Sequence, residues 1–347
     1  VGVNPLCSDD FTKLVKWTDI VGESMRTGSI AKLGLDYENC KKINSNIIYF
    51  SANLQGHSGP YAGYVGYGVQ IAAMAGFWEL AGYPDREPTG TDAYTDYIAP
   101  WYLLAAVIGA LGYRRRTGKG MYIELSQLEA GINFLGPAIL DYTVNQRVDH
   151  RAGNKHPYAV PHGVYPCRGD DRWVAIAVFS DMEWKAFCQV LDNLSWTQEP
   201  RFATLLGRRE NEDELDELIS QWTCEFTPED IMTRLQQAGV SAGVVASGQD
   251  LFADPQLKHR RHFRVLSHAA IGPHSYNAPA YRLSKTPCKL EKAAPCLGED
   301  NEYVLKDILG YSDDDIADML VDGTITTDAD LPIQDFDNTL ANAIAGC

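Results

Sequence analysis

The sequence predicts an α/β protein with a larger domain built on a parallel sheet and a second, smaller α/β domain. In the first half, helical patterns alternate with short β-branched runs, the order typical of parallel strands joined by helices. Near residue 150 the pattern changes to two strands around a polar turn, followed by acidic helices. The 347 residues are 45% hydrophobic and 22% charged, which suits a folded chain with a large core.

Charge and composition restrict the class of protein. The formal net charge of −16 argues against a broad nucleic-acid surface, but it leaves room for one anionic small molecule in a local basic pocket. The longest apolar run, residues 98–111, is shorter than the roughly 20 residues that cross a bilayer, and no signal-peptide pattern opens the chain. We therefore expect a cytoplasmic protein with no membrane partner.

The eight cysteines are scattered, without a CxxC pair or a Cys/His spacing typical of zinc. We expect reduced thiols and no bound metal. His156 and His162 lie near Cys167 in the sequence, but their spacing matches no metal motif.

The first half gives these elements in order. "FTKLVKWTDIV" (11–21) is an amphipathic helix, "GSIAKLGLDYENCKKI" (28–43) is a second helical stretch, and "NIIYFSA" (46–52) is a buried strand. A Gly- and Tyr-rich loop (53–68) precedes an apolar helix (69–82), and loops after parallel strands are common ligand sites. Residues 97–116 are apolar on all sides, which predicts a buried helix, and a strand and a long helix follow in 120–144.

In the second half, "VYPCR" (164–168) and "RWVAIAV" (172–178) predict a hairpin around "GDD". Helices at 211–224 and 227–239, a strand at 240–247 and short β segments within 262–287 come next. The tail (298–325) is helical, with Gly310 as a stop and Ser312 as a cap. We place a large domain at 1–148, a small domain at 149–262 and a return to the large domain at 263–347.

Asp96 precedes the apolar helix and has two possible roles. A lone Asp at such a place is typically an N-cap that accepts a backbone N–H bond. Pro100 favours the first helical position, which would put the cap at Ala99 and Asp96 outside the helix, near its positive end. An ionised carboxylate there needs no general base to act as a nucleophile. The residues alone do not choose between cap and nucleophile.

Two other features also allow more than one interpretation. "RRRTGKG" (114–120) either complements a helix C-terminus or binds phosphate, and Glu124 points either to a site or to solvent. The sequence has no GxGxxG after a strand, no Walker loop and no GxSxG elbow.

Several segments in a fixed order resemble the family III CoA-transferases, the CaiB/BaiF family that includes formyl-CoA, carnitine and benzylsuccinate CoA-transferases. The first is "TDIVGESMRTGSIAKLGLDYENCKKINSNIIYFSANLQGHSGPY", which is similar to the family's strand, Asn-Phe-Arg, helix and QG-x-x-GP loop. The later ones are "GYPDREP", "RRRTGKG", "GVYPC" with "RWVAIAV", "RLSKTP" and "CLGEDNEYVL". The resemblance covers nearly all of residues 11–325.

The resemblance implies a Rossmann-like large domain, an interlocked dimer and a CoA-transferase in which Asp96 is the nucleophile. The aspartate would attack an acyl-CoA, form a mixed anhydride and then an aspartyl-CoA thioester, and pass the CoA to an incoming acid. Gln55 and Gly56, in the glycine-bearing loop, would stabilise the oxyanions. Coenzyme A thioesters and carboxylic acids are then the substrates.

The family's CoA-binding Asn-Phe-Arg appears here as Ser24, Met25 and Arg26, so the resemblance implies that Met25 and Arg26 bind CoA. It also suggests Lys32 as a second phosphate contact. Tyr64, Tyr67 and Tyr97, among other aromatics, would line an acyl pocket for a bulky acid, of which a benzylsuccinate-like acid is one example.

The chain also departs from the family. Val65 stands where formyl-CoA-type members have Lys, which argues against an oxalate-type substrate. Tyr67 stands where the related acyl-CoA racemases have a catalytic His, and because tyrosine is a poor base at neutral pH, this argues against racemisation. The family's opening strand and helix are not in this sequence, so we expect them to be truncated or supplied by another chain or domain. A homodimer, a heterodimer with a homologous subunit, and a non-catalytic CoA-binding partner subunit therefore stay open.

Overall fold

The computed structural model of the chain describes residues 8–327. These residues form two compact units, and each is described here by itself. The first unit takes the described parts of Val1–Val65, Pro100–Ser126 and Pro255–Cys347, and the second takes Gly66–Ala99 and Gln127–Asp254. The domain boundaries at residues 148 and 262 stay predictions.

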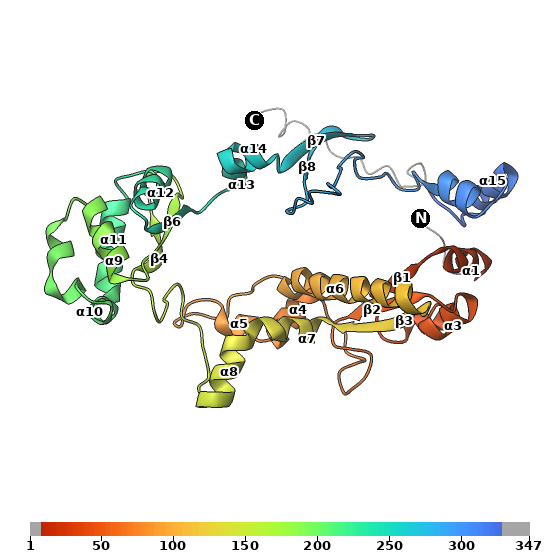
Figure 1. Cartoon of the computed structure of the whole chain (residues 1–347), viewed down its shortest axis with the longest axis horizontal. Coiled ribbons are helices and arrows are strands. Elements are labelled where there is room, and N and C mark those ends of the chain that lie inside the picture. Colours follow the sequence, from red (N-terminus) through yellow and green to blue (C-terminus); the bar gives the residue numbers. More distant parts are fainter. Residues whose placement is uncertain (1–7, 328–347) are drawn as a thin grey trace. The chain divides into compact units, whose positions relative to one another are not determined.

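A three-stranded parallel sheet organises the first unit (Figure 1). Its strands lie in the order β1 (Ile20–Glu23), β2 (Ile48–Asn53) and β3 (Met121–Ser126). The helices α2 (Ser29–Lys32) and α3 (Tyr37–Ile43) connect β1 to β2, as parallel pairing requires. The predicted α/β class and its parallel sheet are confirmed.

Strand β1 corrects the prediction that a helix continues through residue 21. Helix α1 (Ser8–Trp17) makes its last backbone bond from Thr18 N–H to the Leu14 carbonyl, at 2.9 Å. The β-branched pair that follows, Ile20 and Val21, pairs with β2 instead. Helices α1 and α3 pack against β2 in a small core that contains Val15, Cys40 and Tyr49.

Helix α6 (Tyr94–Thr117) corrects two predictions. It begins six residues before Pro100, so the proline lies inside the helix and not at its first position. The all-round apolar pattern also predicts burial, yet Trp101 is 66% exposed and Leu104 and Ile108 are exposed as well. Apolar composition shows which faces can be buried, but it does not show that this chain alone covers them.

Among the described helices, α6 is the one that is long and apolar enough to cross a membrane by length and composition. Core helices of water-soluble proteins pass the same test, so this finding is weak evidence for a span. The C-terminal end of α6 is tied to the sheet, because the Arg114 guanidinium donates to the Asp19 carbonyl at 2.9 Å and to its carboxylate at 2.7 Å.

The rest of the first unit follows residue 254. It consists of α14 (Pro255–Arg260), the hairpin β7 (Phe263–His268) and β8 (Gly272–Asn277), the π-helix η4 (Tyr303–Ile308) and α15 (Asp313–Val321). The predicted stop and cap are confirmed: Gly310 has φ +76°, and the Ser312 hydroxyl accepts from Asp315 N–H at 3.2 Å.

The second unit contains two groups of elements. The first group comprises α4 (Gly68–Met74), α5 (Phe77–Leu80), α7 (Gln127–Ile132), η1 (Asn133–Leu135) and α8 (Gly136–Asn145). The second is an antiparallel sheet, β4 (His162–Pro166), β5 (Trp173–Ala177) and β6 (Ser241–Val244), with the helical segments around it. These segments are α9 (Asp181–Val190), η2 (Ser195–Gln198), η3 (Pro200–Phe202), α10 (Leu205–Glu210), α11 (Glu212–Thr223), α12 (Pro228–Gln237) and α13 (Gly248–Ala253).

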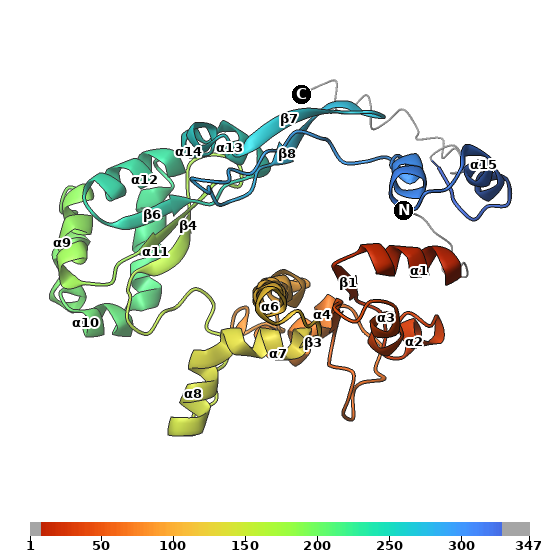
Figure 2. The same cartoon turned by 45° about the vertical axis from the view of Figure 1, so that its right-hand side comes forward.

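The predicted hairpin is confirmed, since β4 and β5 pair antiparallel across the polar turn. Helices α9, α11 and α12 gather beside this sheet in Figure 2. The alternate residues Val174 and Ile176 are fully buried in one core with Phe187, Leu215 and Ile231. Alternation along β5 thus separates a core face from an outer face.

Candidate active site

Asp96 is the third residue of α6, inside its first turn. Its backbone N–H donates to the Ala93 carbonyl at 2.9 Å, and its side chain is exposed. The expectations that Asp96 caps the helix or lies outside it are therefore wrong. Pro100 has no N–H, so the Asp96 carbonyl lacks the helical donor four residues further on.

The Asp96 carboxylate lies directly against Gly68, the first residue of α4. A β-carbon added at Gly68 would stand well inside van der Waals contact of both carboxylate oxygens. Glycine is the residue that leaves room for the carboxylate at this place. Because the carboxylate lies at the N-terminal turns of both α4 and α6, the helix dipoles favour its negative charge.

The neighbouring Thr95 fixes the start of α6. Its side chain is fully buried, and its hydroxyl donates to the Gly68 carbonyl at 3.4 Å. On the other side its methyl group faces Gly131 of α7, where a β-carbon would come within 2.9 Å of it. The buried threonine between two glycines therefore holds the exposed aspartate on a fixed framework.

The aromatic residues predicted for an acyl pocket are exposed. Tyr67 and Tyr97 are 77% and 66% exposed, and Tyr64 is exposed as well, with its ring 4.9 Å from that of Tyr61. The Tyr67 backbone N–H donates to Gln70 Oε1 at 3.0 Å at the start of α4. Their role in substrate binding stays a prediction.

A second polar cluster lies in the first unit, near the carboxyl ends of the parallel strands. The sheet register places Glu23, Ser51 and Glu124 side by side, one on each strand. The Ser51 hydroxyl donates to the Glu23 carboxylate, whose side chain is only 6% exposed. Partial burial, and then the charge of Glu124, raise the pKa of the neighbouring Tyr122 hydroxyl, which stays neutral. Ligands commonly bind at this edge of a parallel sheet.

His57 joins the loops that leave β1 and β2. Its Nε2 contacts the Ser51 hydroxyl and lies 3.7 Å from the Glu23 carboxylate, while its Nδ1 lies 3.2 Å from the Thr27 hydroxyl. Glu23 also accepts from Met25 N–H at 2.6 Å. The candidate CoA segment and the glycine-bearing loop are thus held by one hydrogen-bonded cluster.

The same loop contains the residues predicted to stabilise oxyanions. The Gly56 N–H donates to Asn53 Oδ1 at 2.5 Å, and the His57 N–H donates to Glu124 Oε1 at 2.6 Å. Gly56 has φ +91°, a conformation that favours glycine. In this conformation both N–H groups are engaged within the protein, and the catalytic roles of Gln55 and Gly56 stay predictions.

The predicted phosphate contacts are available to a ligand. Arg26 and Lys32 are exposed, and neither forms an ion pair with any residue in 8–327. One guanidinium nitrogen of Arg26 donates to the Gly63 carbonyl at 2.8 Å, which orients the group. Met25 is 45% exposed and offers an apolar surface beside the two cations.

Sequence reasoning missed Glu23, Ser51 and His57 as members of a site. Each is a common residue in an unremarkable context, and no motif links them across 34 residues. The available signal is their place at the carboxyl ends of strands, but the helical pattern predicted over 11–21 covers the start of β1.

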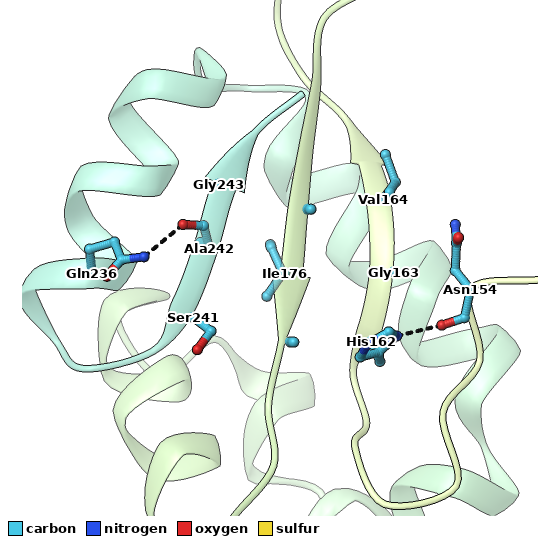
Figure 3. A pocket seen from close by; sticks show the side chains of 11 residues that line it. Asn154, His162, Gly163, Val164, Ile176, Gln236, Ser241, Ala242 and Gly243 are labelled. Carbon is cyan, nitrogen blue, oxygen red and sulfur yellow. Dashed lines mark hydrogen bonds between the residues drawn. The ribbon is translucent and has the colours of Figure 1, made fainter. Parts of the chain in front are cut away.

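A shallow pocket lies on the outer face of β4–β6 in the second unit, with a volume of about 330 Å³ (Figure 3). Small residues such as Ala175 and Gly243 are among those that line it. His162 Nδ1 donates to the Asn154 carbonyl at 2.5 Å, which fixes one side. The rings of His162 and His156 have centroids 5.1 Å apart and are tilted by 30°. Residues 8–327 contain no cluster of three or more side chains suited to a metal ion.

The parallel sheet of the first unit, the antiparallel sheet of the second and the exposed carboxylate at the start of α6 define an α/β protein with a candidate nucleophile, and comparison with known proteins identifies its family. The family model described as CoA-transferase family III matches residues 8–301. The chain belongs to this family and is a CoA-transferase of that class.

Relatives of known name are also CoA-transferases. The chain is 29% identical over 306 residues to the succinyl-CoA–D-citramalate CoA-transferase of Chloroflexus aurantiacus, covering 88% of this chain and 76% of the relative. It is 31% identical over 301 residues to the succinate–glutarate CoA-transferase of Agrobacterium fabrum, covering 85% and 74%. The β and α subunits of a succinyl-CoA–L-malate CoA-transferase are also among its relatives.

The crystal structure of a CAIB/BAIF family protein from Brucella suis superposes with a TM-score of 0.79 at 30% sequence identity. It covers 86% of this chain and 78% of that one. The fold of this family is therefore shared over most of the sequence.

Proposed function

We propose that this chain moves CoA from an acyl-CoA donor to a carboxylic acid, with Asp96 as the nucleophile. The observation that supports this role most directly is an exposed carboxylate held against Gly68 by the buried Thr95. A cap would use its oxygens on backbone N–H groups of its own helix, and Asp96 has no such bond among those formed by residues 8–327. The framework leaves the carboxylate open to an electrophile.

The proposed reaction proceeds through four covalent steps. A carboxylate oxygen of Asp96 attacks the thioester carbonyl, and the C–S bond breaks to give a mixed anhydride and CoA thiolate. The thiolate attacks the aspartyl carbonyl of the anhydride, which releases the donor acid and leaves an aspartyl-CoA thioester. The acceptor carboxylate attacks the aspartyl thioester, and its C–S bond breaks to give a second mixed anhydride and CoA thiolate. The thiolate then attacks the acceptor carbonyl of this anhydride, which forms the new acyl-CoA and releases the Asp96 carboxylate.

In this scheme Arg26 and Lys32 bind phosphate groups of CoA, and Met25 packs against its apolar parts. Two unpaired cations on an exposed segment suit a phosphate ligand. Gln55 and Gly56 would stabilise oxyanions once their loop has adjusted to the substrate. Glu23 and His57 hold that loop and the Met25 segment together.

For the acids, the names of the relatives favour succinyl-CoA as donor and a dicarboxylic acid as acceptor. Those enzymes act on citramalate, glutarate and malate, as their names state. The exposed tyrosines Tyr64, Tyr67 and Tyr97 support a bulkier or aromatic acid as the competing choice. A panel of succinyl-, glutaryl- and benzylsuccinyl-CoA with the matching acids distinguishes the two.

Trapping of the covalent intermediate tests the proposal. The protein is incubated with succinyl-CoA, quenched with hydroxylamine, digested and analysed by mass spectrometry, with Asp96→Asn as the matched control. We expect a hydroxamate on Asp96 in the wild-type peptide and none in the variant. An unmodified Asp96 across the panel, in protein that still transfers CoA, would exclude it as the nucleophile.

A second candidate function is a non-catalytic CoA-binding subunit of a heteromeric transferase. The observation that favours it is the presence of α and β subunits among the relatives. Binding of CoA without any hydroxamate or transfer, and transfer after addition of a catalytic homologue, would support this candidate. Acyl-CoA racemisation is disfavoured because Tyr67 is a poor base at neutral pH, and solvent deuterium exchange into a 2-methylacyl-CoA tests it.

We also propose that the chain is dimeric. The exposed apolar residues Trp101, Leu104 and Ile108 on α6 would be costly to leave in water. Sedimentation of the purified protein measures the state directly, and a monomer at micromolar concentration would contradict this proposal.

A further inference from the structure

The charge of the chain is distributed very unevenly. Residues 255–290 contain seven Lys and Arg, four of the eight histidines and no Asp or Glu. The remainder of the chain has 23 Lys and Arg against 46 Asp and Glu. A strongly acidic protein therefore contains one continuous basic segment, which raises the local positive potential.

The fold concentrates this segment around a pocket of about 710 Å³ in the first unit. The basic and histidine residues that line the pocket come from α14, from the two residues that join α14 to β7, from β7 and from the stretch after β8. They are His259, Arg260, Arg261, His262, Arg264 and Arg282. We call these six residues the basic pocket.

Two of its arginines hold the walls together. The Arg282 guanidinium donates to the Arg260 carbonyl, and Arg260 donates to the Ala280 carbonyl at 3.3 Å. The Ala278 N–H donates to the His262 carbonyl at 2.7 Å. The end of α14 and the stretch after β8 are thus joined by side-chain and backbone bonds.

Two other arginines are free to bind a ligand. The side chains of Arg261 and Arg264 are exposed and have no hydrogen-bond or acidic partner within the described chain. Because no acidic residue lies between 255 and 290, local ion pairs do not neutralise them. Planar guanidinium groups bind phosphate oxygens in a bidentate way.

Size and charge select the ligand class. A pocket of this volume is in the range that holds small molecules. The acidic remainder of the chain would repel the long phosphate backbone of a nucleic acid. A compact anion with several charges satisfies both conditions.

We propose that the basic pocket binds a phosphate or pyrophosphate group of a small molecule, with Arg261 and Arg264 as the principal contacts. The group belongs either to the nucleotide part of a CoA substrate or to a free nucleotide. The site goes beyond the proposed function, which assigns CoA phosphates to Arg26 and Lys32.

Calorimetric titration of the full chain with inorganic pyrophosphate tests the proposal. We expect saturable binding that weakens with added salt, as charge attraction does. The single variants Arg261→Gln and Arg264→Gln should each weaken pyrophosphate about tenfold, since a hydrogen bond to a charged group has about this effect. Arg234→Gln is the matched control: it removes the same charge from an exposed position in α12, outside the pocket.

Parallel titrations with CoA and ADP distinguish the two sources. If the double variant that combines Arg261→Gln with Arg264→Gln weakens CoA binding as much as pyrophosphate binding, the phosphates of CoA occupy the pocket. If it weakens pyrophosphate and ADP but not CoA, the ligand is a separate nucleotide. Melting curves verify that the variants are folded.

The proposal is overturned if pyrophosphate does not bind saturably, or if Arg234→Gln weakens pyrophosphate binding as much as the pocket variants do. Binding by the wild type that both pocket variants retain in full would also overturn it. None of these outcomes depends on Asp96, so the trapping experiment reports on the proposed transfer reaction independently.

Discussion

Replacement of Gly68 by alanine tests whether the position of the Asp96 carboxylate matters. The added methyl group would overlap both carboxylate oxygens, so the side chain must rotate away from α4. Asp96 is exposed and can rotate into solvent, whereas the backbone of α4 does not need to move. The substitution therefore displaces the proposed nucleophile and leaves the fold largely intact.

The expected loss of transfer rate follows from the geometry. Relief of the overlap requires a shift of the carboxylate on the order of 1 Å, and misplacement of this size costs about 100-fold in rate. In stability, alanine within the first turn of a helix is favoured over glycine by about 0.5–1 kcal/mol, which offsets part of the cost of the rotation. We expect a large loss of transfer with little change in melting temperature.

The assay follows CoA exchange between succinyl-CoA and a dicarboxylic acid by chromatography, alongside thermal melting. Gly136→Ala is the matched control, because Gly136 begins α8 with helical dihedral angles and has nothing within 4 Å of its added β-carbon. Transfer by Gly68→Ala within twofold of the wild type would refute the argument. So would an equal loss in Gly136→Ala, because that change touches no part of the site.

Three further predictions concern the framework. His57→Ala should lower the free energy of unfolding by about 1–3 kcal/mol, because Ser51 loses a buried hydrogen-bonding partner. Chemical denaturation measures this loss, with His57→Gln for comparison. An unchanged denaturation midpoint in His57→Ala would contradict a stabilising role for the hydrogen-bonded cluster. Phe187→Ala should cost about 3–5 kcal/mol, since Phe187 is fully buried in the core of the second unit, and calorimetry of this variant measures it. The Arg172 guanidinium beside Asp250 and the Ser247 cap lower the pKa of the Asp250 carboxyl from 3.8 to about 2. The ionised Asp250 carboxylate therefore stabilises the fold above about pH 3.8, and this stabilisation is lost as the pH falls towards 2. Melting temperatures should fall less over this interval in Asp250→Asn than in the wild type.

Local patterns predicted several elements because the cause of each is local. Alternation in "RWVAIAV" gave β5 with its buried Val174 and Ile176, and the tail helix begins at the predicted Ser312 cap. These features depend on side-chain periodicity and on backbone donors within a few residues. Periodicity alone missed strand β1, because four residues give too short a pattern and its identity depends on pairing with β2; the resemblance to the family did imply a strand before Ser24.

The role of Asp96 shows where local reasoning failed. Pro100 was expected to mark the start of the helix, because proline is favoured at the first position. In the structure α6 starts six residues earlier, because a proline within the first two turns removes only one backbone bond. The sequence could identify the aspartate, but it could not show that its carboxylate rests on Gly68.

By itself, the sequence determined the α/β class, the parallel sheet, the antiparallel hairpin β4–β5 and, through the order of its motifs, membership of CoA-transferase family III. Those properties follow from periodicity and from residues that lie close together along the chain. The tertiary structure decided which distant residues share a site: Asp96 with Gly68, Glu23 with Ser51 and His57, and the arginines of the basic pocket. Such groupings depend on strand register and helix packing, which bring together residues that no local pattern connects.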